Sequence, residues 1–108
     1  LDEQFFAFRE SIAAATHSTP ILTGRLLQSW VAGDPDRERV DAIIRDTPNR
    51  VAYSAVVSSD GLTAVDHIHF DAASYRVLGS RYFDALTAAR ANAPTVPGAR
   101  QGESNHPM

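Results

Sequence analysis

Residues Ser59 to Asp71, SDGLTAVDHIHFD, hold the densest group of side chains in this chain that can do acid–base chemistry. Two histidines and three carboxylates occur in this short, glycine-containing stretch. An apolar segment typical of a strand precedes it and a helical pattern follows it. In an open α/β sheet, functional groups gather on the loops that leave the carboxyl ends of the strands. We therefore interpret this loop as the functional site, or as half of one.

Asp66 and His69 lie three residues apart in this loop. A carboxylate beside an imidazole fixes the imidazole's tautomer, and it stabilises the imidazolium that forms when the histidine takes a proton from a serine. The pair is therefore suited to acyl transfer. The structural alternative is that Asp66 and Asp71 serve as caps at a helix N-terminus and His69 only packs nearby.

A metal site is a second alternative. His67, His69 and Asp71 form an H-x-H-x-D run, which presents nitrogen and oxygen ligands of the kind that zinc takes in metallo-β-lactamase-like hydrolases. There the run usually continues with a further histidine, whereas Ala72 follows Asp71 here. The metal-dependent hydrolase is therefore the less favoured hypothesis, and no metal or cofactor is expected.

Composition limits the remaining classes of function. The 108 residues are 44% apolar and carry a net charge of −3 without a basic stripe, so one folded domain is expected and nucleic acid is not an expected partner. The chain has no cysteine, no signal-peptide pattern and no apolar run long enough for a membrane span. These features do not indicate in which cellular compartment the protein works. The start at Leu1, within a helical pattern, indicates a piece of a longer protein.

The hydrophobic pattern predicts helices alternating with strands. A helix is expected over residues 1–16, with Phe5, Phe8, Ile12 and Ala15 as its buried face and Arg9 elsewhere. Strands are expected over 21–27 and 51–57.

Two further helices have recognisable starts. Asp34 and Pro35 begin one helix, in which Val40, Ile43 and Ile44 form the apolar stripe and which Pro48-Asn49 ends. Asp71 caps the last helix, whose stripe comprises Tyr75, Leu78, Tyr82, Leu86 and Ala89. A flexible tail is expected over residues 92–108, because Pro and Gly interrupt any regular pattern there.

The order of these elements predicts the fold class. Helix, strand, helix, strand, helix is the alternation of an α/β protein with a parallel sheet flanked by helices. Two parallel strands do not make an independently stable sheet, because parallel sheets are buried on both faces and need more strands. We therefore expect only a partial sheet, which a missing N-terminal part or another chain completes.

The run VSSDGLTAVDHIHFDAASYRVLGSRYFDAL resembles a known family. Its D-x-x-H-F-D segment is followed by R-x-L-G-x-R-Y, matched by Arg76, Leu78, Gly79, Arg81 and Tyr82. This pattern looks like the C-terminal block of SGNH hydrolases, in particular the sialate O-acetylesterase and acetylxylan esterase branch, and the likeness covers most of residues 1–90. It implies that residues 1–91 are the C-terminal portion of a three-layer, flavodoxin-like domain.

The resemblance also implies an activity. Such enzymes hydrolyse O-acetyl esters of sugars with a serine nucleophile and without a metal or organic cofactor. His69 would be the general base and Asp66 the residue that orients it, whereas His67 has no counterpart. A non-catalytic α/β assembly or binding module is the alternative.

The nucleophile departs from the family pattern. A G-D-S or G-Q-S block, followed by a glycine and an asparagine-bearing block, should precede the D-x-x-H segment, and none does here. Residues 101–105 instead read Q-G-E-S-N, like a block that should lie before residue 1. Ser104 would then be the nucleophile and Asn105 an oxyanion donor of a rearranged chain. A chance match in the tail is the other interpretation.

Three other side chains have simple structural interpretations. Trp30 is expected to cover the edge of the sheet, with stacking on a sugar as the alternative. Arg76 and Arg81 are expected to be solvated or paired on the last helix, with substrate binding as the alternative.

Overall fold

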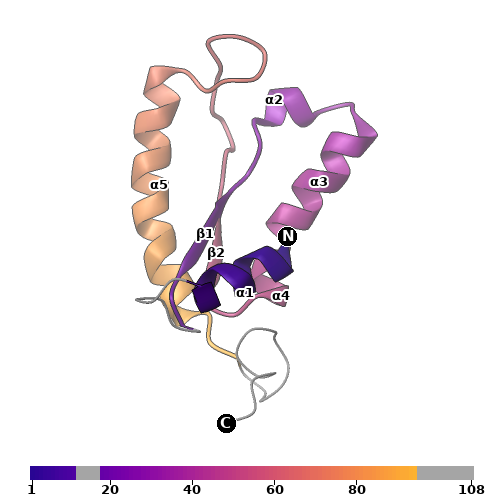
Figure 1. Cartoon of the computed structure of the whole chain (residues 1–108). Helices are drawn as coiled ribbons and strands as arrows, with labels where there is room; N and C mark the ends of the chain where they lie inside the picture. Colours follow the sequence, from indigo (N-terminus) through magenta and orange to yellow (C-terminus); the bar gives the residue numbers. More distant parts are fainter. Residues whose placement is uncertain (12–17, 95–108) are drawn as a thin grey trace.

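The computed structural model describes residues 1–11 and 18–94 (Figure 1). Its elements are α1 (Asp2–Ser11), β1 (Ile21–Gly24), α2 (Gln28–Val31), α3 (Pro35–Arg45), α4 (Thr47–Arg50), β2 (Ser54–Val57) and α5 (Ala72–Ala91). Residues 12–16 of the predicted first helix and residues 95–108 of the predicted tail lie outside the described residues.

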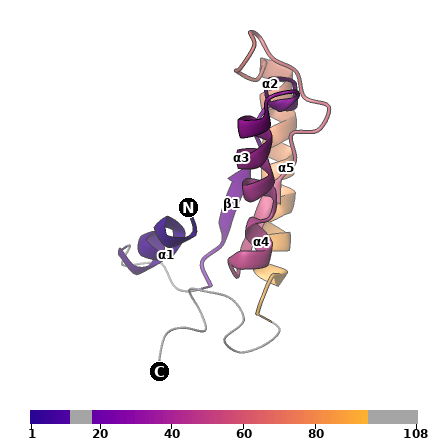
Figure 2. The same ribbon diagram turned by 90° about the vertical axis from the view of Figure 1, so that its right-hand side faces the viewer.

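The sheet consists of β1 and β2, which pair in parallel with Ile21 opposite Ser54 and Gly24 opposite Val57. Long α5 lies on one side of the strands and α3 on the other (Figures 1 and 2). The predicted α/β class and the parallel pairing are therefore confirmed for the described part of the chain.

Both strands are shorter than predicted. Tyr53 has a positive φ of 56°, so residues 52–53 form a turn before β2. After β1, Leu27 is buried and leads into α2, a short helix that the sequence analysis missed. Each strand therefore keeps only the four residues that pair with its neighbour.

The core lies between β2 and α5. It consists of Ala55, Val57, Leu78, Ala85 and Ala89, with Leu22, Leu62 and Phe70 packed against it. Small side chains on both elements allow the helix to lie close to the strand.

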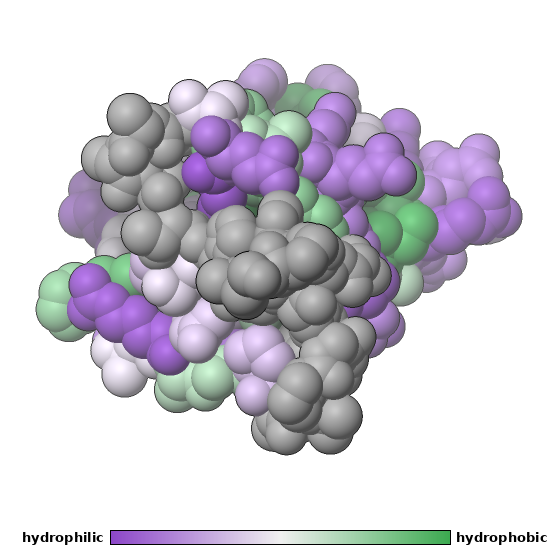
Figure 3. All heavy atoms as spheres, turned by 60° about the horizontal axis from the view of Figure 1, so that its bottom comes forward, coloured by the Kyte–Doolittle hydropathy of each residue, from purple (hydrophilic) through white to green (hydrophobic). Residues whose placement is uncertain are grey.

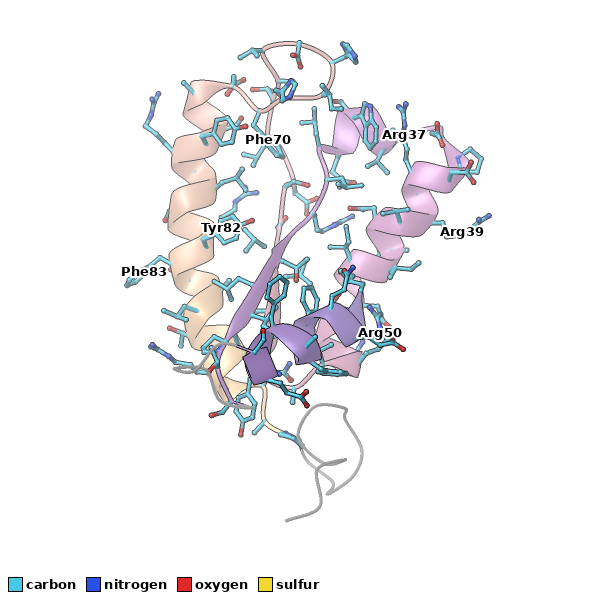
Figure 4. All side chains as sticks on the ribbon, viewed as in Figure 1. Arg37, Arg39, Arg50, Phe70, Tyr82 and Phe83 are labelled. Atoms are coloured by element: carbon cyan, nitrogen blue, oxygen red, sulfur yellow. The ribbon has the colours of Figure 1, made fainter. Side chains whose placement is uncertain are left out.

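The predicted stripe of α5 is partly wrong. Leu78 and Ala89 are buried as expected, but Tyr75 and Tyr82 are 55% and 37% exposed. Ser74 and Ala85 take inward positions instead. The reason is that the helix contacts β2 through small residues, so the larger Tyr75 and Tyr82 stay partly exposed. Phe83 of the same helix points away from the strands (Figure 4).

Gly24 gives a test of this packing. A Cβ at position 24 would overlap the Tyr82 hydroxyl, which is the end of a flexible, partly exposed side chain. We expect Gly24→Ala to lower the free energy of unfolding by about 1 kcal/mol, the low end for overpacking, and to cost less in a Tyr82→Phe background. Urea denaturation checks this, with Gly79→Ala, where nothing lies within 4 Å, as the control. If Gly24→Ala lost equal stability in the wild-type chain and in Tyr82→Phe, the result would contradict a close approach of the Tyr82 hydroxyl to position 24.

The buried face of α1 also differs from the prediction. Phe8 is 62% exposed, whereas Arg9 is 4% exposed. The Arg9 guanidinium donates to the carbonyl oxygens of Thr19, Ala52 and Tyr53 at 2.7–3.2 Å. Arg9 takes the inward position that was predicted for an apolar residue. The reason is that these backbone oxygens, next to the start of each strand, need hydrogen-bond donors.

The predicted start of α3 is confirmed, but the predicted apolar inner face of this helix is wrong. Asp34 accepts from the amides of Asp36 and Arg37, and Pro35 is the first helical residue. However, Val40 and Ile43 are 50% and 47% exposed, and the buried residue is Asp41.

The end of that helix also differs from the prediction. The helix ends at Arg45, and Pro48-Asn49 lie within α4. Because proline is compatible with the first turn of a helix, Pro48 lies in the first turn of α4 instead of ending a helix.

Apolar surface is limited on the face that Figure 3 turns forward. Hydrophilic side chains predominate there among the described residues, and apolar ones are scattered between them. Within the ranges that the structure describes, no helix has the length and apolar character needed to span a bilayer.

Candidate active site

The loop between β2 and α5 lies at the carboxyl ends of both strands, as predicted (Figure 1). Ala64 and Phe70 form an antiparallel bridge, and the Val65 amide donates to the His69 carbonyl at 3.0 Å. The chain between Ala64 and Phe70 is therefore folded back on itself like a hairpin. Asp66 and His69 both lie within this fold.

Asp66 and His69 contact each other directly. Asp66 Oδ2 lies 2.8 Å from His69 Nδ1, while Asp66 Oδ1 accepts from the amides of Ile68 and His69 at 2.8 and 2.7 Å. The side chains are 44% and 69% exposed. With Nδ1 donating to the carboxylate, Nε2 is the ring nitrogen that carries a lone pair. This Asp66–His69 dyad has the arrangement of a general base and its orienting carboxylate.

The same hydrogen bonds set the charge state of Asp66. Hydrogen bonds from the His69 amide, the His69 ring and the Ile68 amide hold the pKa of Asp66 well below its usual range. Asp66 is therefore ionised at neutral pH. A permanent negative charge beside the ring stabilises the imidazolium that a general base forms.

Two arginines hold the first part of the loop. Arg81 of α5 donates to the carbonyl oxygens of Ser58 and Asp60 at 2.8 and 2.9 Å. Arg25 Nη1 lies 3.8 Å from Asp60 Oδ1. Arg81 is therefore paired, and its partners are backbone oxygens of the loop. Arg76 is exposed, as expected of a solvated residue.

A buried polar network supports the same end of the sheet. Arg25 binds Asp41 at 2.5 Å, and Asp41 also accepts from the Leu26 amide and Gln28 Nε2, each at 3.3 Å. Gln28 donates in addition to Ser59 Oγ at 3.2 Å, and Ser59 donates to the Leu26 carbonyl at 2.6 Å. The network connects the ends of β1 and β2 to α2 and α3. The hydrophobic pattern of the sequence does not predict this network, although a carboxylate between the apolar residues of α3 is a signal for it.

Trp30 of α2 packs against an arginine. The Arg37 guanidinium lies 3.9 Å from the centre of the indole ring and donates to the Trp30 carbonyl at 3.0 Å. One face of the ring is therefore occupied.

The structure does not bring the H-x-H-x-D residues together as metal ligands. In residues 1–11 and 18–94, no three His, Cys, Asp or Glu side chains form a group that could hold a metal ion. His69 Nδ1 is bound to Asp66, and both carboxylate oxygens of Asp71 accept hydrogen bonds, from Thr63 and from the Ser74 amide.

The predicted site residues are thus placed only in part. Asp66 and His69 are brought together, whereas Ser104 and Asn105 lie outside the described residues. No family model matches the chain, and no solved structure matches it.

Proposed function

We propose that this chain carries the histidine and aspartate part of an SGNH-type esterase that hydrolyses O-acetyl esters on carbohydrates. One observation carries the proposal. The Asp66 Oδ2 to His69 Nδ1 contact of 2.8 Å lies in the loop that follows the carboxyl end of β2, where α/β enzymes place their reacting groups.

The proposed reaction uses His69 Nε2 as the base. It takes the proton of a serine hydroxyl while the serine oxygen attacks the acetyl carbonyl carbon, and Asp66 stabilises the resulting imidazolium. His69 then gives the proton to the departing sugar oxygen, which leaves an acetyl-serine. In the second half, His69 activates a water that releases acetate and regenerates the serine. No metal or organic cofactor takes part.

The serine has two candidate sources in this proposal. One is Ser104 of the chain itself, with Asn105 as an oxyanion donor. The other is a further segment, or another chain, that also completes a three-layer, flavodoxin-like sheet beside β1. Partial exposure of all four β1 residues, among the described part of the chain, supports an incomplete sheet.

Acetate release from acetylated sugars by the purified 108-residue chain tests the function. We expect release that depends on His69, and Ser104→Ala distinguishes the two sources of the nucleophile. Loss of activity without unfolding assigns the nucleophile to Ser104, whereas retained activity assigns it to another serine of this chain. A folded chain that releases no acetate would contradict Ser104 as the nucleophile and leave a further segment or another chain as its source.

The second candidate function is a non-catalytic assembly or binding module. Large apolar side chains at the surface favour it, since Phe83, Val65 and Phe8 are 76%, 70% and 62% exposed. A folded but inactive chain that self-associates would support this function.

A further inference from the structure

The base of the dyad loop is closed by three polar residues, Thr63, Asp71 and Ser74, which we call the loop base. The Thr63 hydroxyl donates to Asp71 Oδ2, and the Asp71 amide donates to the Thr63 carbonyl at 3.1 Å. Ser74, only 4% exposed, accepts from the Thr63 amide at 2.9 Å. Asp71 Oδ1 accepts from the Ser74 amide at 2.8 Å and so caps α5.

The two oxygens of Asp71 therefore have different partners. Oδ1 accepts a hydrogen bond from the Ser74 amide in the first turn of α5, as the side chain of an N-cap residue usually does. Oδ2 instead binds Thr63, eight residues earlier, on the other side of the dyad loop. Capping α5 does not require this second contact.

Closure at the loop base matters because the dyad is held by short-range contacts. Asp66 binds amides only two and three residues further on, and such local turns compete with solvation of an open loop. Joining Thr63 to Asp71 restricts the ends of the segment that contains the turn, which lowers the entropy cost of forming it. Ser74 also fixes this segment to the first turn of α5.

We propose that Asp71, through Thr63, is a positioning residue for the Asp66–His69 dyad. Its catalytic consequence rests on the esterase function proposed above. The consequence for the geometry of the dyad does not depend on that function.

Three substitutions separate positioning from capping. Thr63→Val removes the hydroxyl that binds Oδ2 and leaves the cap intact. Asp71→Ala removes both contacts, while Asp71→Asn keeps an acceptor for Ser74 and offers Thr63 a donor instead. Asp34→Ala is the matched control, because Asp34 caps α3 through the amides of Asp36 and Arg37.

Kinetics of the full chain give the first measurement. We expect Thr63→Val and Asp71→Ala to lower kcat on the order of 10²-fold, as small misplacements of catalytic groups do, with KM unchanged. Asp71→Asn should restore most of kcat, and Asp34→Ala should leave it unchanged. Equal kcat in the wild-type chain and Thr63→Val would overturn the proposal.

Amide hydrogen exchange at Ile68 and His69 gives a measurement that does not need activity. Both amides donate to Asp66, so exchange should become faster in Thr63→Val and Asp71→Ala and stay unchanged in Asp34→Ala. Unchanged exchange in folded Thr63→Val would overturn the positioning role. A wild-type chain without esterase activity would instead contradict Ser104 as the nucleophile, and the exchange rates would still decide the role of Asp71.

Discussion

Replacing His69 by alanine is expected to lower the rate of p-nitrophenyl acetate hydrolysis by about 10²- to 10⁴-fold, the usual contribution of a positioned general base. The reason is the 2.8 Å contact with Asp66, which orients the ring and stabilises its protonated form. Initial rates at neutral pH, with folding checked by circular dichroism, measure the effect.

His67 is the matched control for this substitution. It lies in the same loop and is exposed like His69, while the Asp66 carboxylate binds the ring of His69. His67→Ala should therefore retain nearly full activity. Equal losses for the two variants would mean that exposed imidazoles react without help from the dyad, and this result would contradict the assignment.

The largest expected effect on stability follows from Asp41→Ala. Asp41 is 3% exposed and accepts hydrogen bonds from Arg25, Gln28 and the Leu26 amide. Its removal leaves the partly buried Arg25 guanidinium with only the exposed Asp60 carboxylate 3.8 Å away. We expect this to cost about 3 kcal/mol, the low end for breaking a buried ion pair. Urea denaturation of the wild-type protein and of Asp41→Ala measures the difference in the free energy of unfolding.

Asp36→Ala is the control on the same helix. Its ion pair with Arg39 is almost fully solvent-exposed, so we expect little change in stability. If the Asp36 and Asp41 variants lost equal stability, the network would not be what holds the ends of the strands together.

The stability contribution of Asp41 also depends on pH. Burial alone would raise the pKa of Asp41, but hydrogen bonds from Arg25, Gln28 and the Leu26 amide outweigh it and lower the pKa below its ordinary value. The contribution is therefore fully present above the unfolded pKa of about 3.9 and is lost as the pH falls through the folded pKa. Asp41→Asn should lose less stability on acidification below about pH 4 than the wild-type chain.

Local signals made part of the fold predictable. The helix caps at Asp34 and Asp71 depend on a few neighbouring residues and were placed correctly. The two apolar segments contain the strands, which are shorter than predicted. The Asp66–His69 contact was predictable for the same reason, because residues three apart in a turn meet without any distant partner.

Inward-facing polar residues were not predictable, because their partners lie far away in the sequence. The buried Arg9 donates hydrogen bonds to the carbonyl oxygens of residues 52 and 53, more than 40 positions away in the sequence. The buried Asp41 accepts one from Arg25, which directly follows β1. An apolar stripe is a poor guide where such contacts decide which face of a helix turns inward. The nucleophile stays a prediction, since Ser104 lies outside the described residues.

Covalent trapping with a fluorophosphonate, followed by peptide mass spectrometry, tests most directly whether the dyad activates a serine. We expect a single labelled serine in the active protein, formed at least about 10²-fold faster than in His69→Ala, because the base is required. Equal labelling rates in the wild-type chain and His69→Ala, or ester hydrolysis without any labelled serine, would contradict this expectation.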